Sequence, residues 1–213
     1  RKLLRNILRE KHMRKSEDIR DVIADEYELD REVPENLKTA TVAMGCFWGV
    51  EALFGGLEGV YRTRVGYTGG NKSNPTYHSL GKHTETVQMD YNPEEISYED
   101  ILEVFFENHN HERKAKAQYA SRIFYHDEEQ KETAEKVKPE GSATTIDMLE
   151  TFWLAEDYHQ KYRFRGTHEA EKMLEKYDEE QFINSTLAAK LNASVAGKLS
   201  HDIDDEEFQN LSH

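Results

Sequence analysis

The chain has 213 residues, of which 37% are hydrophobic, 10% are aromatic and 33% are charged. Its 28 basic and 42 acidic side chains give a formal net charge of −14, which disfavours general nucleic-acid binding because phosphate backbones attract excess positive charge. No apolar run approaches the ~20 residues of a membrane-spanning helix. We therefore expect a protein that binds neither nucleic acid nor a membrane, with one domain and extensions.

Cys46 is the only cysteine in the sequence. An intrachain disulfide and a zinc site built on several thiolates are therefore excluded. The His109 to His111 region fits no zinc template, and a helix end explains it better. We expect no metal and no bound organic cofactor, so a thiol partner for Cys46 must come from another molecule.

The first 36 residues differ in composition from the rest of the chain. Residues 1–15 are basic with helical apolar spacing, residues 18–35 are acidic, and Pro34 marks a boundary. A solvated helix and linker is the simple interpretation, and a processed organelle-targeting segment is the alternative. With no secretory segment visible, we expect a cytoplasmic monomer.

Alternating and helical patterns follow one another from residue 38 to residue 165. The predicted strands are 39–44, 60–67, 84–91, 121–125 and 144–152. Apolar residues at helical spacing follow Cys46, and the pairs Ser97–Asp100 and Asp127–Gln130 predict the starts of two further helices.

The first part of this order is β-α-β-β-α-β, which is typical of a ferredoxin-like split fold. We therefore predict an α+β class, two-layer sandwich with a mostly antiparallel sheet. Its domains are an N-terminal extension over 1–36, a catalytic domain over 37–165 and a helical C-terminal extension over 166–213, with two or three amphipathic helices.

Cys46 lies between a predicted strand and a predicted helix, with Gly45 before it and Gly49 shortly after. Free N–H groups and the positive end of the helix dipole favour thiolate, so we expect a lowered thiol pKa. Phe47 and Trp48 can form an apolar wall beside the sulfur. A buried, inert cysteine is the alternative.

Glu85 ends the apolar face of the strand 84–91, which also carries Val87, Met89 and Tyr91. Burial raises a carboxyl pKa, and a protonated carboxyl near neutral pH can act as a general acid. On the strand pattern alone, a charge that turns to solvent is favoured. Tyr77 and Tyr119 offer phenols, and His159 is either catalytic or bonded to the core.

The sequence resembles the peptide methionine sulfoxide reductase A family over residues 39–165. The matching segments are Gly45-Cys46-Phe47-Trp48-Gly49, Val65-Gly66-Tyr67-Thr68-Gly69-Gly70, Asn74-Pro75-Thr76-Tyr77, His83-Thr84-Glu85, residues 124–130 and residues 155–160. The resemblance implies a peptide-methionine (S)-S-oxide reductase that serves protein repair under oxidative stress. It implies oxidised proteins and free methionine sulfoxide as substrates.

The resemblance also implies a role for each matching residue. Cys46 corresponds to the nucleophile and Glu85 to the general acid that protonates the sulfoxide oxygen. Phe47 and Trp48 correspond to the wall that holds the S-methyl group, and the phenols correspond to donors to that oxygen. Those phenols are Tyr77 and Tyr119. The implied product is a Cys46 sulfenic acid, resolved by external thioredoxin, glutaredoxin with glutathione, or dithiothreitol.

Two departures from the family pattern affect this expectation. The family commonly has C-terminal resolving cysteines, whereas this chain has none. Lys114 stands where the family usually has an acidic residue, and Glu112 is the nearby carboxylate that could replace it. A binding module of the same fold with weak turnover is therefore the alternative function. Another thiol enzyme, a peroxidase or a Cys/His hydrolase, ranks last because no histidine spacing positions one beside Cys46.

Overall fold

The computed structural model describes residues 33–198, and the expectations for residues 1–32 and 199–213 lie outside it. One six-stranded sheet runs through the described chain in the order β5-β4-β1-β3-β2-β6. The strands are β1 (Lys38–Met44), β2 (Val60–Thr68), β3 (Thr84–Tyr91), β4 (Ser121–Tyr125), β5 (Thr145–Met148) and β6 (Trp153–Leu154).

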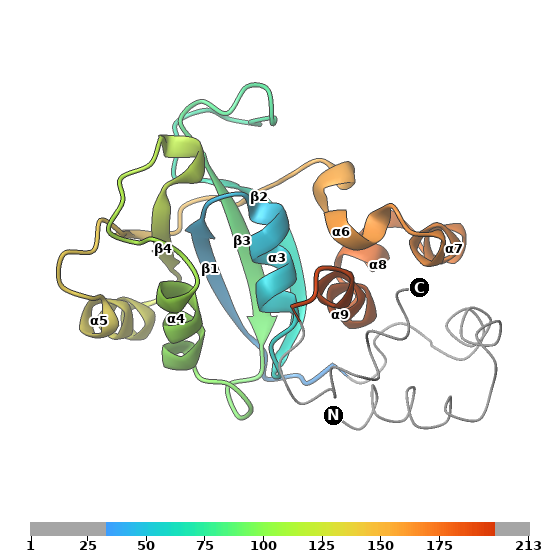
Figure 1. Cartoon of the computed structure of the whole chain (residues 1–213), viewed down its shortest axis with the longest axis horizontal. Helices are drawn as coiled ribbons and strands as arrows, with labels where there is room; N and C mark the ends of the chain where they lie inside the picture. Colours follow the sequence, from blue (N-terminus) through green and yellow to red (C-terminus); the bar gives the residue numbers. More distant parts are fainter. Residues whose placement is uncertain (1–32, 199–213) are drawn as a thin grey trace.

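The helices of the described chain cover one face of the sheet and one end of it (Figure 1). They are α3 (Phe47–Gly55), α4 (Tyr98–Glu107), α5 (Glu128–Val137), α6 (Tyr162–Arg165), α7 (His168–Lys176), α8 (Glu179–Ile183) and α9 (Thr186–Val195), with short 3-10 helices η1 (Ala117–Tyr119) and η2 (Asp157–His159). No helix among residues 33–198 has the length and apolarity needed to cross a membrane.

The strand pairing confirms the predicted ferredoxin-like arrangement. β1 pairs antiparallel with both β3 and β4, and β2 pairs antiparallel with β3. The pair β4–β5 is parallel, so the sheet is mostly antiparallel as expected. The two helix starts predicted from caps also form, since Ser97 and Asp127 each accept the N–H three residues ahead.

The predicted last strand over 144–152 is confirmed only over residues 145–148, which form β5. β5 pairs with β4 at one edge of the sheet, whereas β6 pairs with β2 at the opposite edge. Residues 149–152 connect the two edges, and Thr68 Oγ1 donates to the Thr151 carbonyl at 2.6 Å on the way. The break follows from pairing with two distant partners, which local alternation does not reveal.

Core residues explain why α3 lies where it does. Val50 and Phe54 of α3 are buried against Val42 and Val87 of the sheet. The close approach of α9 to α3 depends on Gly55, where a Cβ atom would lie 2.9 Å from the Ala189 carbonyl oxygen.

The C-terminal helices pack against the predicted catalytic domain. Lys190 of α9 donates to the carbonyls of Gly55 and Leu57 at 2.9 and 2.6 Å, at the C-terminal end of α3. The helices also have a small core of their own, formed by Phe164, Ala170, Met173, Phe182 and Ala188. The three-part division of the chain stays a prediction, but its C-terminal part is in contact with the helix that follows Cys46.

Candidate active site

Cys46 occupies the turn between β1 and α3. Gly45 has φ +109°, a left-handed conformation that favours glycine, and it lets the chain leave the sheet and enter the helix. Cys46 is the extended N-cap of α3, and the residue is exposed as a whole although its sulfur is partly buried. The first N–H groups of α3 have no carbonyl partner within the helix, so they are available to the Cys46 sulfur and to other acceptors nearby.

Glu85 uses one of these N–H groups. Its Oε2 accepts the N–H of Phe47 at 3.1 Å, directly after Cys46, and its Oε1 accepts Gln118 Nε2 at 2.8 Å. The residue is only 1% exposed, so the strand-end charge does not turn to solvent. Burial raises the pKa of Glu85 above its ordinary value, although Gln118, the Phe47 N–H and the charge of Lys116 oppose the shift.

The expected lowering of the Cys46 pKa is contradicted. Hydrogen bonds from the N–H groups of Trp48 and Gly49 do lower it, as a helix N-terminus should, and the charge of Arg163 adds to this. Partial burial of the sulfur is the largest effect, however, and with the charge of Glu85 it raises the thiol pKa. The thiol is therefore mostly protonated at neutral pH.

Tyr77 and Tyr119 lie together close to Cys46 and Glu85. Their hydroxyls share a hydrogen bond, and burial, that bond and the charges of Glu85, Tyr77 and Cys46 raise the pKa of Tyr119 to about 12. Tyr119 is therefore a neutral donor, and the charges of both Glu85 and Cys46 act on it. The two predicted phenols converge on the predicted nucleophile and acid.

Glu156 folds the Tyr77 loop back, as the sequence interpretation required. Its Oε1 accepts the N–H of Tyr77 at 3.0 Å, and its Oε2 accepts the hydroxyl of Tyr67 at 2.8 Å. Burial would raise the pKa of Glu156, but these hydrogen bonds hold it below the ordinary value. Tyr67 of β2 lies directly opposite Glu85 of β3. Glu156 therefore connects the Tyr77 loop to β2 at the position next to Glu85.

Trp48 and Phe47 have different surroundings. Trp48 is half-buried and stacks on Tyr162 of α6, with ring centroids 3.6 Å apart and planes within 3°. Phe47 is buried in the main core, so Trp48 rather than the Phe47 ring supplies apolar surface beside Cys46. Phe47 contributes its backbone N–H to Glu85.

His159 supports Trp48 from below. It is 1% exposed, and its Nδ1 accepts the indole N–H of Trp48 at 3.0 Å. Burial lowers the pKa of His159, so the ring is neutral and can accept that bond. The sequence left open whether His159 is catalytic or bonded to the core. The structure shows a buried ring that contacts the site through the Trp48 indole.

Sequence reasoning missed Gln118 as a partner of Glu85. The expected substitute, Glu112, is exposed, and Lys114 is exposed as well. Gln118 lies in η1 beside Tyr119, so a polar residue next to a predicted phenol was the available signal. Among residues 33–198, no three His, Cys, Asp or Glu side chains form a group that could hold a metal ion.

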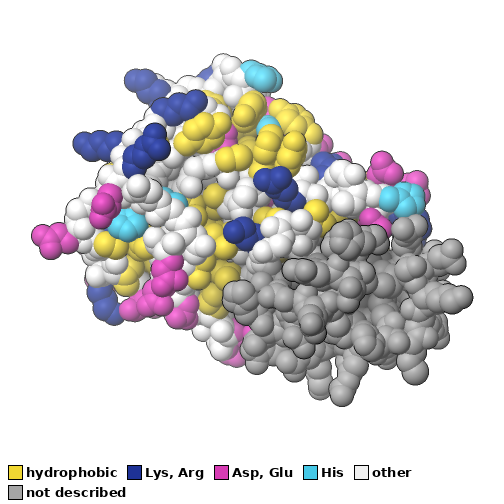
Figure 2. Space-filling model, viewed as in Figure 1, with side chains coloured by type: hydrophobic (Ala, Val, Ile, Leu, Met, Phe, Trp, Pro, Cys, Tyr) yellow, Lys and Arg dark blue, Asp and Glu magenta, His cyan; other side chains and the backbone are white. Residues whose placement is uncertain are grey.

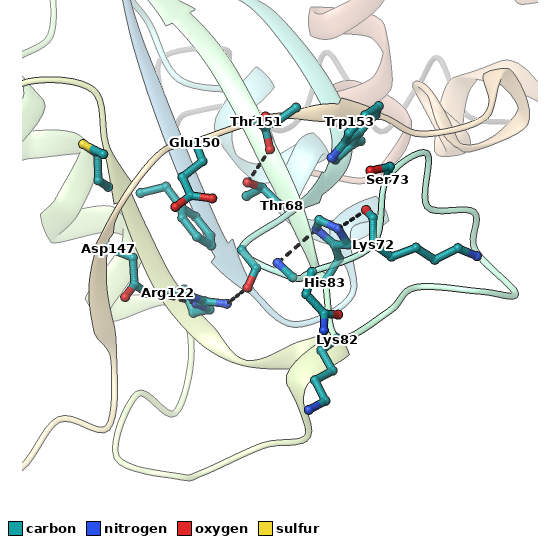
Figure 3. Close-up of a pocket in the computed structure, with 15 residues that line it drawn as sticks. Thr68, Lys72, Ser73, Lys82, His83, Arg122, Asp147, Glu150, Thr151 and Trp153 are labelled. Carbon is teal, nitrogen blue, oxygen red and sulfur yellow. Dashed lines mark hydrogen bonds and ion pairs between the residues drawn. The ribbon is translucent and has the colours of Figure 1, made fainter.

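A cavity of about 670 Å³ lies on the sheet face turned away from α3 and α4 (Figure 3). Arg122 crosses it, paired with Asp147 at 2.7 Å and donating to the Gly69 carbonyl. Thr68 and Thr84 line or border it, whereas Glu85 points to the opposite face of β3. The cavity is therefore separate from the thiol–acid site.

A thiol beside a buried acid and two phenols defines a cysteine-based redox or transfer enzyme. Comparison with known proteins specifies the family, since the family model "Peptide methionine sulfoxide reductase" matches residues 38–191. The match extends beyond the segment that resembled the family and includes most of the C-terminal helices.

Individual relatives agree. The chain is 44% identical over 169 residues to the peptide methionine sulfoxide reductase of Drosophila melanogaster, covering 75% of this chain and 68% of the relative. It is 43% identical over 142 residues to the enzyme MsrA of Acidobacterium capsulatum, covering 58% of this chain and 91% of the relative.

Solved structures give the same result. Methionine sulfoxide reductase A of Corynebacterium diphtheriae superposes with a TM-score of 0.57 at 26% identity, over 62% of this chain and 76% of that one. Reduced Mxr1 from Saccharomyces cerevisiae also superposes with a TM-score of 0.57, at 27% identity, over 64% of this chain and 89% of Mxr1. The chain belongs to the peptide methionine sulfoxide reductase family, and it is an oxidoreductase that acts on methionine sulfoxide.

Proposed function

We propose that this chain reduces the S epimer of methionine sulfoxide, in proteins or free, with Cys46 as nucleophile and Glu85 as general acid. The observation that carries the proposal is the hydrogen bond from the Phe47 N–H to Glu85 Oε2 at 3.1 Å. It places a buried carboxyl under the first turn of the helix that begins at Cys46. Nucleophile and acid are thus held by one backbone segment.

The chemistry needs both groups together. A sulfoxide oxygen leaves poorly until it is protonated, so attack by the Cys46 thiolate at sulfur is coupled to proton donation from Glu85. The oxygen is transferred to Cys46, which becomes a sulfenic acid, and methionine is released in reduced form. Tyr77 and Tyr119 donate hydrogen bonds to the oxygen as negative charge develops on it.

Recycling uses thiols from other molecules, because Cys46 is the only cysteine of the chain. A first thiol condenses with the sulfenic acid, which forms a mixed disulfide and releases water. A second thiolate then attacks the mixed disulfide, restores the Cys46 thiol and leaves as the oxidised reductant. A thioredoxin-type dithiol or two molecules of glutathione could supply both thiols.

The apolar wall accounts for the position of the S-methyl group. Trp48 is fixed by its stack on Tyr162 and by the bond to His159, so it presents a rigid apolar surface next to the sulfur of Cys46. The wall contacts the S-methyl group on one side of the sulfur and the phenols bind the oxygen on the other. Only one epimer can make both contacts while its sulfur faces Cys46, which supports selection of that epimer.

The test uses one equivalent of each epimer without reductant. We expect the S epimer to add one oxygen atom to Cys46 by mass spectrometry and to release one methionine per lost thiol. The R epimer and the Cys46→Ser variant serve as controls and should show neither change. Methionine formation by Cys46→Ser would refute the proposal, and stoichiometric binding without turnover in dithiothreitol would favour the binding module instead.

A further inference from the structure

Basic side chains border the candidate site on two sides. Arg113, Lys114 and Lys116 lie in the segment before η1, and Arg163 lies on α6; these four residues are termed the basic rim. All four side chains are exposed. None of them forms an ion pair with another residue between 33 and 198. Within the described part of the chain, no carboxylate competes with a bound molecule for these four charges.

Two members of the basic rim reach the reacting groups. The Nζ atom of Lys116 lies 4.8 Å from the centroid of the Tyr119 ring, and its charge acts on Glu85. Arg163 follows Tyr162, whose ring stacks on Trp48, and the charge of Arg163 lowers the pKa of Cys46. Figure 2 shows Lys and Arg side chains gathered beside a hydrophobic patch, at the end of the molecule where α3 begins in Figure 1.

The local charge is opposite to the charge of the whole chain, which is −14. Glu112 is the only acidic residue between 111 and 119, against three basic ones. Glu156 is also close, but its carboxylate is turned inward and bonded to Tyr67 and Tyr77. A ligand that reaches Cys46 past residues 113–116 therefore meets a positive border, whereas the exposed Asp157 lies on η2 next to Glu156.

We propose that the basic rim binds acidic residues that flank an oxidised methionine in a polypeptide substrate, an inference that rests on the proposed function. A methionine sulfoxide side chain that reaches Cys46 leaves its neighbouring residues outside the site, where exposed basic groups can pair with Asp or Glu. The large negative charge of the rest of the chain disfavours longer polyanions such as nucleic acids. Short acidic segments of a polypeptide are therefore the ligands that suit the basic rim.

The experiment compares two short peptides, each with one methionine (S)-sulfoxide, flanked by Asp and Glu in one and by Ser and Gln in the other. Dithiothreitol is the reductant because it is uncharged at neutral pH. We expect kcat/KM for the acidic peptide to exceed that for the neutral one about fivefold at low ionic strength, which is the size of a few exposed ion pairs. The preference should disappear toward about 0.5 M salt.

A triple variant, Arg113→Gln, Lys114→Gln and Lys116→Gln, should bring the ratio between the peptides close to one. A ratio within one variant is unaffected by any change that Lys116 causes in the chemical step. The matched control is Lys38→Gln, Lys131→Gln and Lys136→Gln, which removes the same charge from exposed lysines paired with Glu129, Glu128 and Glu99. The control should keep the preference.

Two outcomes overturn the proposal: equal kcat/KM values in the unaltered chain, or a preference that survives in the triple variant. Failure of the proposed function has a different signature, because then the neutral peptide is not reduced either. In that event, calorimetric titration of Cys46→Ser with the two peptides still tests the basic rim. Tighter binding of the acidic peptide, lost in the triple variant, would support it, and equal binding would refute it.

Discussion

Lys161 and Glu51 form an ion pair, with 2.8 Å between Nζ and Oε1, in which both side chains are 0% exposed. Glu51 belongs to α3, the helix that Cys46 precedes, and Lys161 follows the segment that holds His159. The Lys161 backbone N–H also donates to Glu51 Oε2 at 2.8 Å, and Nζ donates to the Ile183 carbonyl at 3.0 Å. One buried carboxylate thus joins α3 to the segment that carries the aromatic support of Trp48.

Removing the cation should be costly, because a buried carboxylate would then lack its charge partner. We expect Lys161→Met to lower the free energy of unfolding by about 3–5 kcal/mol, measured by urea titration. Lys131→Met removes a surface lysine paired with Glu128, and it should change the free energy of unfolding by less than about 1 kcal/mol. Equal effects of the two substitutions would contradict the assignment.

The pH profile of kcat/KM should reveal an acid and a thiolate that act together. The reaction needs a protonated Glu85 carboxyl and an ionised Cys46 thiol. Because burial raises the pKa values of both groups, this form is the less populated of the two singly protonated forms of the site. The rate should rise with pH up to the Glu85 pKa, stay level, and fall above the Cys46 pKa.

Glu85→Gln should lower kcat by about 10²–10⁴ and abolish the alkaline fall, because no carboxyl remains to lose a proton. The matched control is Glu150→Gln, an exposed residue at the cavity on the other sheet face, which should keep the full profile. A Glu85→Gln profile that still falls at alkaline pH would refute the role of the acid.

The same variant makes a prediction about the thiol itself. The negative charge of Glu85 raises the pKa of Cys46, so its removal should shift the thiol titration to lower pH. The rate of iodoacetamide alkylation against pH measures this directly, since the chain has one cysteine. Glu150→Gln should titrate like the unaltered chain, and an unmoved midpoint in Glu85→Gln would mean that the charges do not interact.

Gln118 should tune the acid. The hydrogen bond from its side-chain amide to Glu85 Oε1 lowers the pKa of the Glu85 carboxyl. Gln118→Ala should therefore raise that pKa and move the acid limb of the rate profile to higher pH. We expect kcat/KM in the level region to rise severalfold, because more of the chain then combines a protonated carboxyl with an ionised thiol, and kcat/KM at acidic pH to stay unchanged. Lys116→Gln removes a weaker influence and should move the limb less in the same direction. A shift to lower pH in Gln118→Ala would contradict the hydrogen bond.

The two phenols should act as a coupled pair. Tyr77 and Tyr119 share a hydrogen bond, so Tyr119→Phe removes a donor and also a partner of Tyr77. Each single substitution to Phe should lower kcat by roughly 10- to 100-fold. The double variant should lose less than the product of the two effects. Independent, multiplicative losses would show that the phenols act separately.

Local patterns predicted most of the sheet and the two capped helices. Alternation over 84–91 placed Glu85 on the helix-covered face, and the Ser97–Asp100 pair forms the capping box that its spacing indicated. The ferredoxin-like order followed from these local elements. The cytoplasmic location, the monomeric state and the roles of the site residues stay predictions.

The features that could not be predicted depend on tertiary contacts. The sign of the Cys46 pKa shift is decided by how much protein packs around the sulfur, which no local pattern contains. Gln118 reaches Glu85 across 33 positions, and Lys161 reads as an ordinary surface lysine although it is fully buried. The end of β5 at residue 148 and the start of β6 at residue 153 likewise depend on partners at opposite edges of the sheet.

The placement of β5 and β6 has a consequence for contact with other polypeptides. In the part of the chain that the structure describes, the sheet is bordered by strands of only four and two residues, joined across its rear by residues 149–152. Such brief borders offer few unpaired amides on which a foreign extended segment could align. On the proposed action on oxidised polypeptides, one oxidised side chain could therefore enter the site while the surrounding chain finds no sheet edge on which to pair.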